Sequence, residues 1–142
     1  MDMPIAIKVV EPNSDNQRTG AERLAEVLPE KNNINIEWLT TLENIKGDSD
    51  WTIVSTTSRW RTAIIKKLLD KGHRRFLIEK MVCQSKEEYE DLLENFKVRQ
   101  AKAWVDCTRR YFPFYQKIFH LMKGEKNLIF NVTSGNHGLG SN

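Results

Sequence analysis

The sequence has few of the features that mark membrane, secreted or metal-binding proteins. None of its apolar runs approaches the roughly 18 residues of a membrane span, and Met1-Asp2 leads into charged chain rather than a signal peptide. The only two cysteines, Cys83 and Cys107, lack the number and spacing of a disulfide framework or a zinc site. The three histidines have no metal-ligand spacing either. We therefore expect a soluble cytoplasmic protein with reduced thiols and no metal.

The charge is nearly balanced. The 22 basic and 19 acidic residues leave a net charge of only +3, too little to indicate a nucleic-acid or membrane partner. The length of 142 residues is that of one ordinary domain, and a hydrophobic fraction of 39% is enough for a packed core. The sequence therefore predicts one compact unit.

Strand and helix patterns alternate along the chain. Short β-branched or apolar runs predict strands, and apolar residues three or four apart predict helices. The predicted strands are residues 5–10, 34–38, 51–56, 76–78, 103–105 and 128–132, and the predicted helices are 15–28, 60–69, 85–96 and 114–121, with a helical turn at 41–45 and a loop at 135–140. This order predicts a Rossmann-like α/β fold, in three layers, with a parallel sheet and helices on both of its faces.

Several local predictions follow from the helix patterns. Gly72 and Gly124 are predicted to end helices, and Ser85 with Glu88 fits a capping box. The predicted buried faces are Trp60, Ile64, Ile65, Leu68 and Leu69 in one helix and Tyr89, Leu92, Leu93 and Phe96 in the next. The aromatic cluster Tyr111, Phe112, Phe114, Tyr115 and Phe119 is interpreted as core or interface rather than a base-stacking platform.

The segments that follow three predicted strands carry a family pattern. Residues 50–56 read D-W-T-I-V-S-T, and Gly72 and then Glu79-Lys80 follow. This run resembles the Gfo/Idh/MocA oxidoreductases, whose nucleotide domain has D-x-V-x-x-x-T-P, a helix, G-K-H-V and E-K-P. The segments V-V-E-P at 9–12, T-R-R-Y-F-P at 108–113 and the tail 135–142 resemble further parts of the family pattern. The resemblance thus covers nearly the whole chain.

The chain departs from the family pattern at several places. Thr57 and Met81 stand where the family has proline, and Arg61 takes the usual histidine position. Nothing before Ile5 supplies a first strand with its G-x-G-x-x-G turn, and the family's catalytic aspartate and histidine segment is not present. The prediction is that residues 1–142 form one partial NAD(P)-binding domain, with 125–142 the start of a truncated substrate domain.

The missing first strand has a physical consequence. In the doubly wound order 3-2-1-4-5-6, strand 1 lies in the middle, so its loss separates strands 2 and 4. Each buried unpaired peptide group costs about 1 to 3 kcal/mol, against a domain stability of about 5 to 15 kcal/mol. We expect that the sheet re-pairs, that another chain supplies a strand, or that Met1 is not the natural beginning.

The resemblance implies roles for residues at the ligand edge of the sheet. Glu11 ends a strand, where a carboxylate can accept hydrogen bonds from the ribose of NAD and repel the 2'-phosphate of NADP; otherwise it is a solvated turn residue. In the family the lysine of Glu79-Lys80 lies by the nicotinamide and assists proton transfer, and its alternative role is a surface ion pair. For that task a lysine needs partial desolvation and a neighbour that holds it.

The remaining candidates are hydroxyl and guanidinium groups. Thr56, Thr57 and Ser58 are predicted to line the cofactor loop, to cap the following helix, or both. Arg110 is a candidate for substrate binding through its planar donor fork, and with Arg109 it is otherwise a solvated basic pair.

The resemblance implies an NAD(P)-dependent oxidoreductase, with NAD favoured, that transfers a hydride to or from a sugar or cyclitol. The full-length enzyme would then bind a small sugar-like molecule and form a homo-oligomer, with no nucleic-acid or membrane partner. The isolated chain is expected to be inactive or very weak, and the sequence leaves open whether it binds a dinucleotide. The alternative is a non-catalytic α/β module that self-associates through exposed sheet edges.

Overall fold

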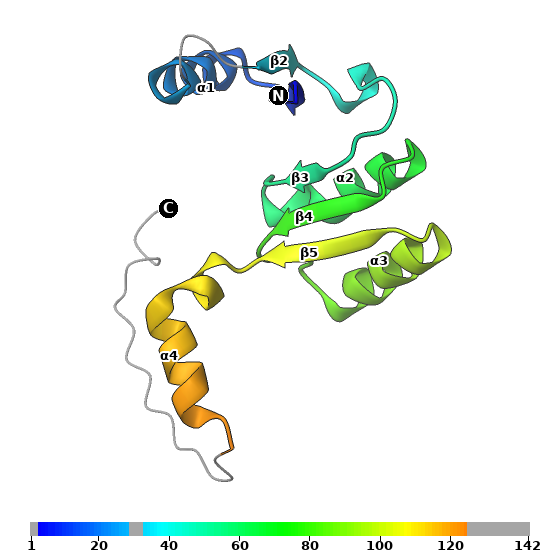
Figure 1. The fold of residues 1–142 in the computed structure, drawn as a ribbon. Helices are drawn as coiled ribbons and strands as arrows, with labels where there is room; N and C mark the ends of the chain where they lie inside the picture. Colours follow the sequence, from blue (N-terminus) through cyan, green and yellow to red (C-terminus); the bar gives the residue numbers. More distant parts are fainter. Residues whose placement is uncertain (1–2, 29–32, 125–142) are drawn as a thin grey trace. The chain divides into compact units, whose positions relative to one another are not determined.

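The computed structural model describes residues 3–28 and 33–124, which belong to two compact units divided between Asp106 and Cys107 (Figure 1). The predicted strand at 128–132, the loop at 135–140 and the proposed start of a substrate domain at 125–142 lie outside the described residues. Among the described helices, none is long and apolar enough to cross a membrane.

Strands and helices alternate through the first unit, as the sequence predicts. Its elements are β1 (Ile5–Val10), α1 (Ser14–Val27), β2 (Ile34–Leu39), the 3-10 turn η1 (Leu42–Asn44), β3 (Thr52–Val54), α2 (Ser58–Asp70), β4 (Arg75–Glu79), α3 (Lys86–Val98) and β5 (Lys102–Asp106). Every strand and helix predicted for this unit is therefore confirmed, with small shifts at the ends.

All strand pairs are parallel, which confirms the parallel α/β class. The strands form two sheets rather than one: β1 pairs with β2, and the other three follow the order β3-β4-β5. These two sheets have the neighbour relations of strands 2-3 and 4-5-6 in the doubly wound order. Among the described residues β1 and β3 each pair on one side only, so the two sheets stay separate.

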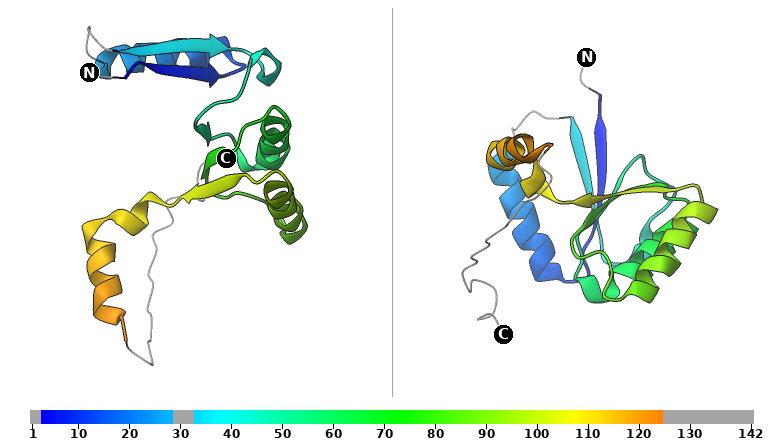
Figure 2. Two further views of the ribbon diagram at one scale, coloured as in Figure 1. Left: turned by 45° about the vertical axis from the view of Figure 1, so that its right-hand side comes forward. Right: turned by 90° about the horizontal axis from the view of Figure 1, so that it is seen from below.

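The core lies between the three-stranded sheet and the helices α2 and α3. Both helices pack on the same face of this sheet (Figure 2), because their buried residues form one cluster with those of β3 and β4. The cluster consists of Val54, Ile65, Leu68, Leu69, Phe76, Ile78, Leu92 and Phe96. The opposite face exposes Trp51, Ile53 and Trp104, and the two indole rings are 5.0 Å apart.

The predicted buried faces of these helices are correct for Ile65, Leu68, Leu69, Leu92 and Phe96. Trp60 and Tyr89, both predicted to be buried, are 60% and 54% exposed, and Leu93 is also exposed. In the first turns of α2, Arg61 and Thr62 are buried instead. The Trp60 indole lies against the Arg59 guanidinium, 5.2 Å from it, on the solvent side.

Polar side chains cap the first turns of α1 and α3. The Asn13 side chain accepts hydrogen bonds from the amides of Asp15 and Asn16 at the start of α1. At α3 the Ser85 hydroxyl accepts from the Glu88 amide at 3.1 Å, as the capping box predicts. The Glu88 carboxylate accepts from the Gln84 amide at 3.0 Å instead of from Ser85, so only half of the reciprocal box forms.

Gly72 ends the turn between α2 and β4 with φ of +100°. The nearest atom to an added Cβ is 3.8 Å away, so backbone strain rather than space sets the cost of a side chain. We expect Gly72→Ala to lower the free energy of unfolding by about 1 to 2 kcal/mol, measured by urea titration. Gly72→Asn is expected to lose less, because asparagine tolerates positive φ better. Equal losses in the two variants would contradict the strain argument.

The second unit contains the 3-10 turn η2 (Thr108–Tyr111) and the helix α4 (Pro113–Met122). Its helix is predicted correctly, and Gly124 follows with φ of +100°. The five aromatic residues interpreted as core or interface are all exposed: Tyr111, Phe112, Phe114, Tyr115 and Phe119. The interpretation of this aromatic cluster as core is therefore wrong for the described residues, and its interpretation as an interface stays a prediction.

Candidate functional site

The segments that follow β3 and β4 are joined by the buried side chain of Arg61. This residue is the fourth of α2 and is 3% exposed. Its Nη1 donates to the carbonyl oxygen of Glu79 at 2.6 Å and to that of Met81. Its Nη2 donates to the carbonyl oxygen of Thr56. One guanidinium group therefore joins the segments that carry Thr56 and Lys80, and we call residues 55–57 and 79–82 the carboxyl edge.

Lys80 lies within this edge, immediately after β4. Its side chain is exposed, and among the described residues no hydrogen bond or ion pair holds its ammonium group. The peptide bond between Lys80 and Met81 is cis. Glu79 is half-buried, and its backbone oxygen is occupied by Arg61. The catalytic role of Lys80 and the cofactor role of Glu79 stay predictions.

The hydroxyl groups of Thr56, Thr57 and Ser58 lie at the start of α2, and only some of them make hydrogen bonds. Thr57 is the N-cap residue of α2, yet its side chain makes no capping hydrogen bond. The Thr56 hydroxyl lies 3.5 Å from the Thr57 carbonyl oxygen, and the Ser58 hydroxyl accepts from the Gln84 side chain at 3.2 Å. The predicted capping by these side chains is therefore not seen. Their cofactor role stays a prediction.

Glu11 follows β1 and is half-buried. One carboxylate oxygen accepts a hydrogen bond from the Asn13 amide at 2.9 Å, which is the contact of a turn residue. The Gln17 side chain donates to the carbonyl oxygens of Glu11 at 2.6 Å and Leu39 at 3.3 Å. The ends of β1 and β2 are thus joined by a helix side chain, as Arg61 joins those of β3 and β4.

Arg110 belongs to the second unit. It lies in η2 with its side chain exposed, and its carbonyl oxygen accepts from the Gln116 side chain. Its role in substrate binding stays a prediction.

Next to the carboxyl edge, Glu88 connects α3 to α2. Its carboxylate accepts from the Thr62 hydroxyl at 3.2 Å as well as from the Gln84 amide. Burial raises the pKa of the Cys83 thiol, and the charge of Glu88 raises it further. The thiol therefore stays protonated near neutral pH, which makes Cys83 a poor nucleophile.

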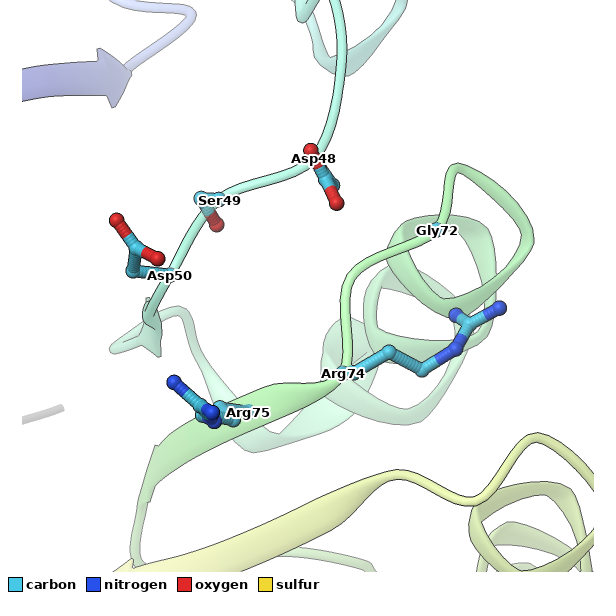
Figure 3. A pocket seen from close by; sticks show the side chains of 6 residues that line it. All are labelled: Asp48, Ser49, Asp50, Gly72, Arg74 and Arg75. Carbon is cyan, nitrogen blue, oxygen red and sulfur yellow. The ribbon is translucent and has the colours of Figure 1, made fainter.

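The hollow in Figure 3 lies at the other end of the strands. Its volume is about 220 Å³, and it is lined by Asp48, Ser49, Asp50, Gly72, Arg74 and Arg75. These residues lie before or at the starts of β3 and β4, whereas ligands of open parallel sheets bind beyond the carboxyl ends. The hollow is therefore not the predicted cofactor site.

A buried histidine connects the segments on either side of this hollow. His73 is 3% exposed, and its Nδ1 lies 2.9 Å from the Ser49 Oγ and 2.7 Å from the Thr52 Oγ1. Its Nε2 is buried and has no partner within the described part of the chain. The ring thus joins the start of β3 to the turn before β4.

The sequence predicted Thr56 and Lys80 as site residues, but it did not identify Arg61, which joins their segments, or Gln17, which joins the ends of β1 and β2. Arg61 was noted only as a departure from the family pattern, and Gln17 was not singled out. Both are the fourth residue of a helix that follows a strand, on the first turn. A polar residue at that position, where an apolar face is expected, is the signal that could have found them.

Known structures share this fold. No protein-family model and no curated protein matches the sequence. The WlbA dehydrogenase of Chromobacterium violaceum, solved with NADH and UDP-GlcNAcA, aligns with a TM-score of 0.61 and 14% identity over 86% of this chain and 40% of its own. WlbA of Bordetella pertussis, solved with the same two molecules, aligns with a TM-score of 0.59 and 12% identity over 84% of this chain and 43% of its own.

A variant of KijD10, a 3-ketoreductase of Actinomadura kijaniata solved with TDP-benzene and NADP, gives a TM-score of 0.60 and 14% identity over 84% of this chain and 42% of its own. The chain thus spans about two fifths of the length of the structures it matches. At such identities the likeness concerns the fold. The chain shares the Rossmann-like α/β fold of these dehydrogenase and reductase structures, which is the fold that the resemblance of its motifs predicts.

Proposed function

We propose that this chain is part of the nucleotide-binding domain of an NAD(P)-dependent oxidoreductase of the Gfo/Idh/MocA type that acts on a sugar or cyclitol. The observation that carries the proposal is the carboxyl edge itself. The family's motif residues Thr56 and Lys80 follow neighbouring parallel strands, and one guanidinium group joins their segments. Ligands of this fold class bind at that edge.

The side chains present there fit a dinucleotide. Among the described residues the Lys80 ammonium is unpaired, the Thr57 hydroxyl makes no capping bond, and the Glu11 carboxylate accepts one hydrogen bond, from the Asn13 amide. Each keeps hydrogen-bonding capacity for a ligand. The nicotinamide, when bound, supplies the carbon that accepts or donates the hydride.

Each candidate then has a role in that reaction. Glu11 accepts hydrogen bonds from the ribose hydroxyls and disfavours a 2'-phosphate, which makes NAD the preferred cofactor. Thr56, Thr57, Ser58 and Glu79 line the cofactor loop. Lys80 lies beside the substrate hydroxyl and receives or returns its proton, and Arg110 binds polar groups of the substrate. The NADH, NADP and UDP-GlcNAcA in the matched structures support a nicotinamide cofactor and a sugar-derived substrate.

Titration of the purified chain with NADH and NADPH tests the cofactor assignment, with the fluorescence of Trp38, Trp51, Trp60 and Trp104 as the signal. We expect saturable binding of NADH that is tighter than that of NADPH. Glu11→Gln is expected to weaken NADH binding by about tenfold, the effect of losing one hydrogen bond to a charged group.

Glu22→Gln, at an exposed position of α1, is the matched control and is expected to bind like the unsubstituted chain. Equal affinity for NADH in the Glu11 and Glu22 variants would contradict the role of Glu11. A polypeptide of residues 1–142 alone is expected to show no or very weak turnover of sugars. Ready turnover would overturn that expectation.

A second candidate function is self-association as a non-catalytic α/β module. The specific observation in its favour is that, among the described residues, β1 and β3 each have one unpaired edge, and apolar side chains such as Ile53 (71% exposed) stand beside them. A tight dimer in solution without NADH binding would favour this function. Saturable NADH binding by a monomer would exclude it.

A further inference from the structure

The backbone on both sides of Lys80 is bonded to one nitrogen atom. Nη1 of Arg61 donates to the carbonyl oxygens of Glu79 and Met81, the residues before and after Lys80. The Lys80 backbone is thereby fixed while its side chain remains exposed. Because Nη2 of the same group donates to the Thr56 carbonyl oxygen, the position of Lys80 is also tied to the end of β3.

The arginine side chain at position 61 has enough N–H donors for the three carbonyl oxygens that it bonds. Gln17, at the equivalent position of α1, bonds two carbonyl oxygens with the two hydrogens of its amide. Arg61 bonds three, which exceeds what an amide can donate and suits the planar five-donor guanidinium. A lysine at this place would carry the same charge without the fixed fork.

Burial makes this arrangement costly to disturb. Arg61 is 3% exposed, and within the described residues no carboxylate forms an ion pair with it. The three carbonyl oxygens are its hydrogen-bond acceptors, and its Nε has no partner there. Without the guanidinium, three backbone acceptors at the carboxyl edge would lose their hydrogen-bond partner. The segments after β3 and β4 would then no longer be hydrogen-bonded to the same side chain of α2.

We propose that Arg61 is the positioning residue of the carboxyl edge, which sets Lys80 and Thr56 at a fixed separation for the cofactor. This inference rests on the proposed function for its purpose, but the positioning itself is a property of the free chain. Arg61 does not touch the cofactor in this role. It acts through the backbone of residues 56 and 79–81.

Backbone amide hydrogen exchange tests the positioning without any ligand. In Arg61→Met we expect the amides of residues 56–58 and 80–82 to exchange about tenfold faster or more, relative to the amides of Phe76 and Ile78 in the core strand β4. Arg59→Met is the matched control, because it removes the same charge from an exposed position of the same helix turn. It is expected to leave these ratios unchanged.

If Arg61 only stabilises the fold as a whole, the hydrogen-exchange pattern of the variant is different. If all amides of Arg61→Met accelerate by one common factor, or if the edge amides match those of Arg59→Met, the proposal is overturned. Should Arg61→Met fail to fold, Arg61→Lys replaces it, since it keeps the charge and most of the volume. Faster exchange confined to the carboxyl edge in that variant supports the role of the fork, and unchanged exchange overturns it.

Ligand binding supplies the second measurement. NADH is expected to bind Arg61→Ala about tenfold more weakly than the unsubstituted chain. Millimolar guanidinium chloride is expected to restore part of that affinity, whereas ammonium chloride at the same concentration is not. Equal effects of the two salts would overturn the proposal. If the unsubstituted chain does not bind NADH at all, the proposed function fails, and the exchange measurement still decides whether Arg61 positions the edge.

Discussion

Phe76→Ala is expected to lower the free energy of unfolding by about 3 to 5 kcal/mol, the usual cost of truncating a buried phenylalanine. Phe76 is the second residue of β4 and is 0% exposed. Its ring meets that of Phe96 edge to face, with 5.3 Å between the ring centroids. The variant loses this contact and leaves a cavity between the sheet and both helices. Since domain stability is about 5 to 15 kcal/mol, this loss is about a fifth of it or more.

Urea titration followed by far-UV circular dichroism measures this loss. Tyr89→Ala is the matched control, because it removes an aromatic ring of similar size that is 54% exposed. It is expected to change the free energy of unfolding by less than about 1 kcal/mol. Similar losses in the two variants would mean that Phe76 is not in a packed core, and the parallel three-stranded sheet would be in doubt.

Acidification is expected to destabilise the fold through His73. Burial lowers the pKa of His73, and the nearby cations Lys71, Lys8 and Arg74 lower it further, against the opposing charge of Asp48. Above the ordinary histidine pKa of about 6.5 the ring is neutral in both states, so it adds no pH dependence. As the pH falls below about 6.5, the unfolded chain takes up the proton and the folded chain does not. The free energy of unfolding therefore falls as the pH decreases, until the pH is below the lowered pKa of His73 in the folded state.

The free energy of unfolding, measured at several pH values between 5 and 7.5, tests this linkage. His73 alone can contribute a slope of up to about 1.4 kcal/mol per pH unit. His73→Asn keeps a polar group for Ser49 and Thr52 but does not titrate, and we expect it to remove that part of the slope. His120→Asn, at an exposed position of α4, is the control and is expected to leave the slope unchanged. An unaltered slope in His73→Asn would show that other groups cause the acid sensitivity.

The elements of the fold could be read from the sequence because their signals are local. The β-branched run at Ile53 and Val54, the Ser85 cap and the Gly72 stop each act within a few residues of the chain, and the structure has all three. The errors arise where a helix meets its neighbours. Trp60 and Tyr89 fit the apolar period but are exposed, and in α2 Arg61 and Thr62 are buried instead.

The candidate site was predictable only in part. Motif spacing placed Thr56 and Lys80 after neighbouring strands, and parallel pairing brings the ends of such strands to one edge. Gln17 and Arg61 could not be assigned in this way, because their partners are backbone carbonyl oxygens 6 to 22 and 5 to 20 residues away along the chain. Any strand-end carbonyl has the same chemistry, so no side-chain pattern identifies these contacts in advance.

The sequence by itself therefore determined the order and type of the elements, the parallel α/β class and the residues at the strand ends, because periodicity, caps and turns depend on near neighbours in the chain. Only the tertiary structure decided that the described strands form two sheets, that a buried arginine joins the segments around Lys80, and that His73 is buried with one nitrogen that has no partner among the described residues. These features depend on which distant backbone groups meet when the helices pack on the sheet. A hydrogen bond or a burial cost arises only once that packing has brought the groups together.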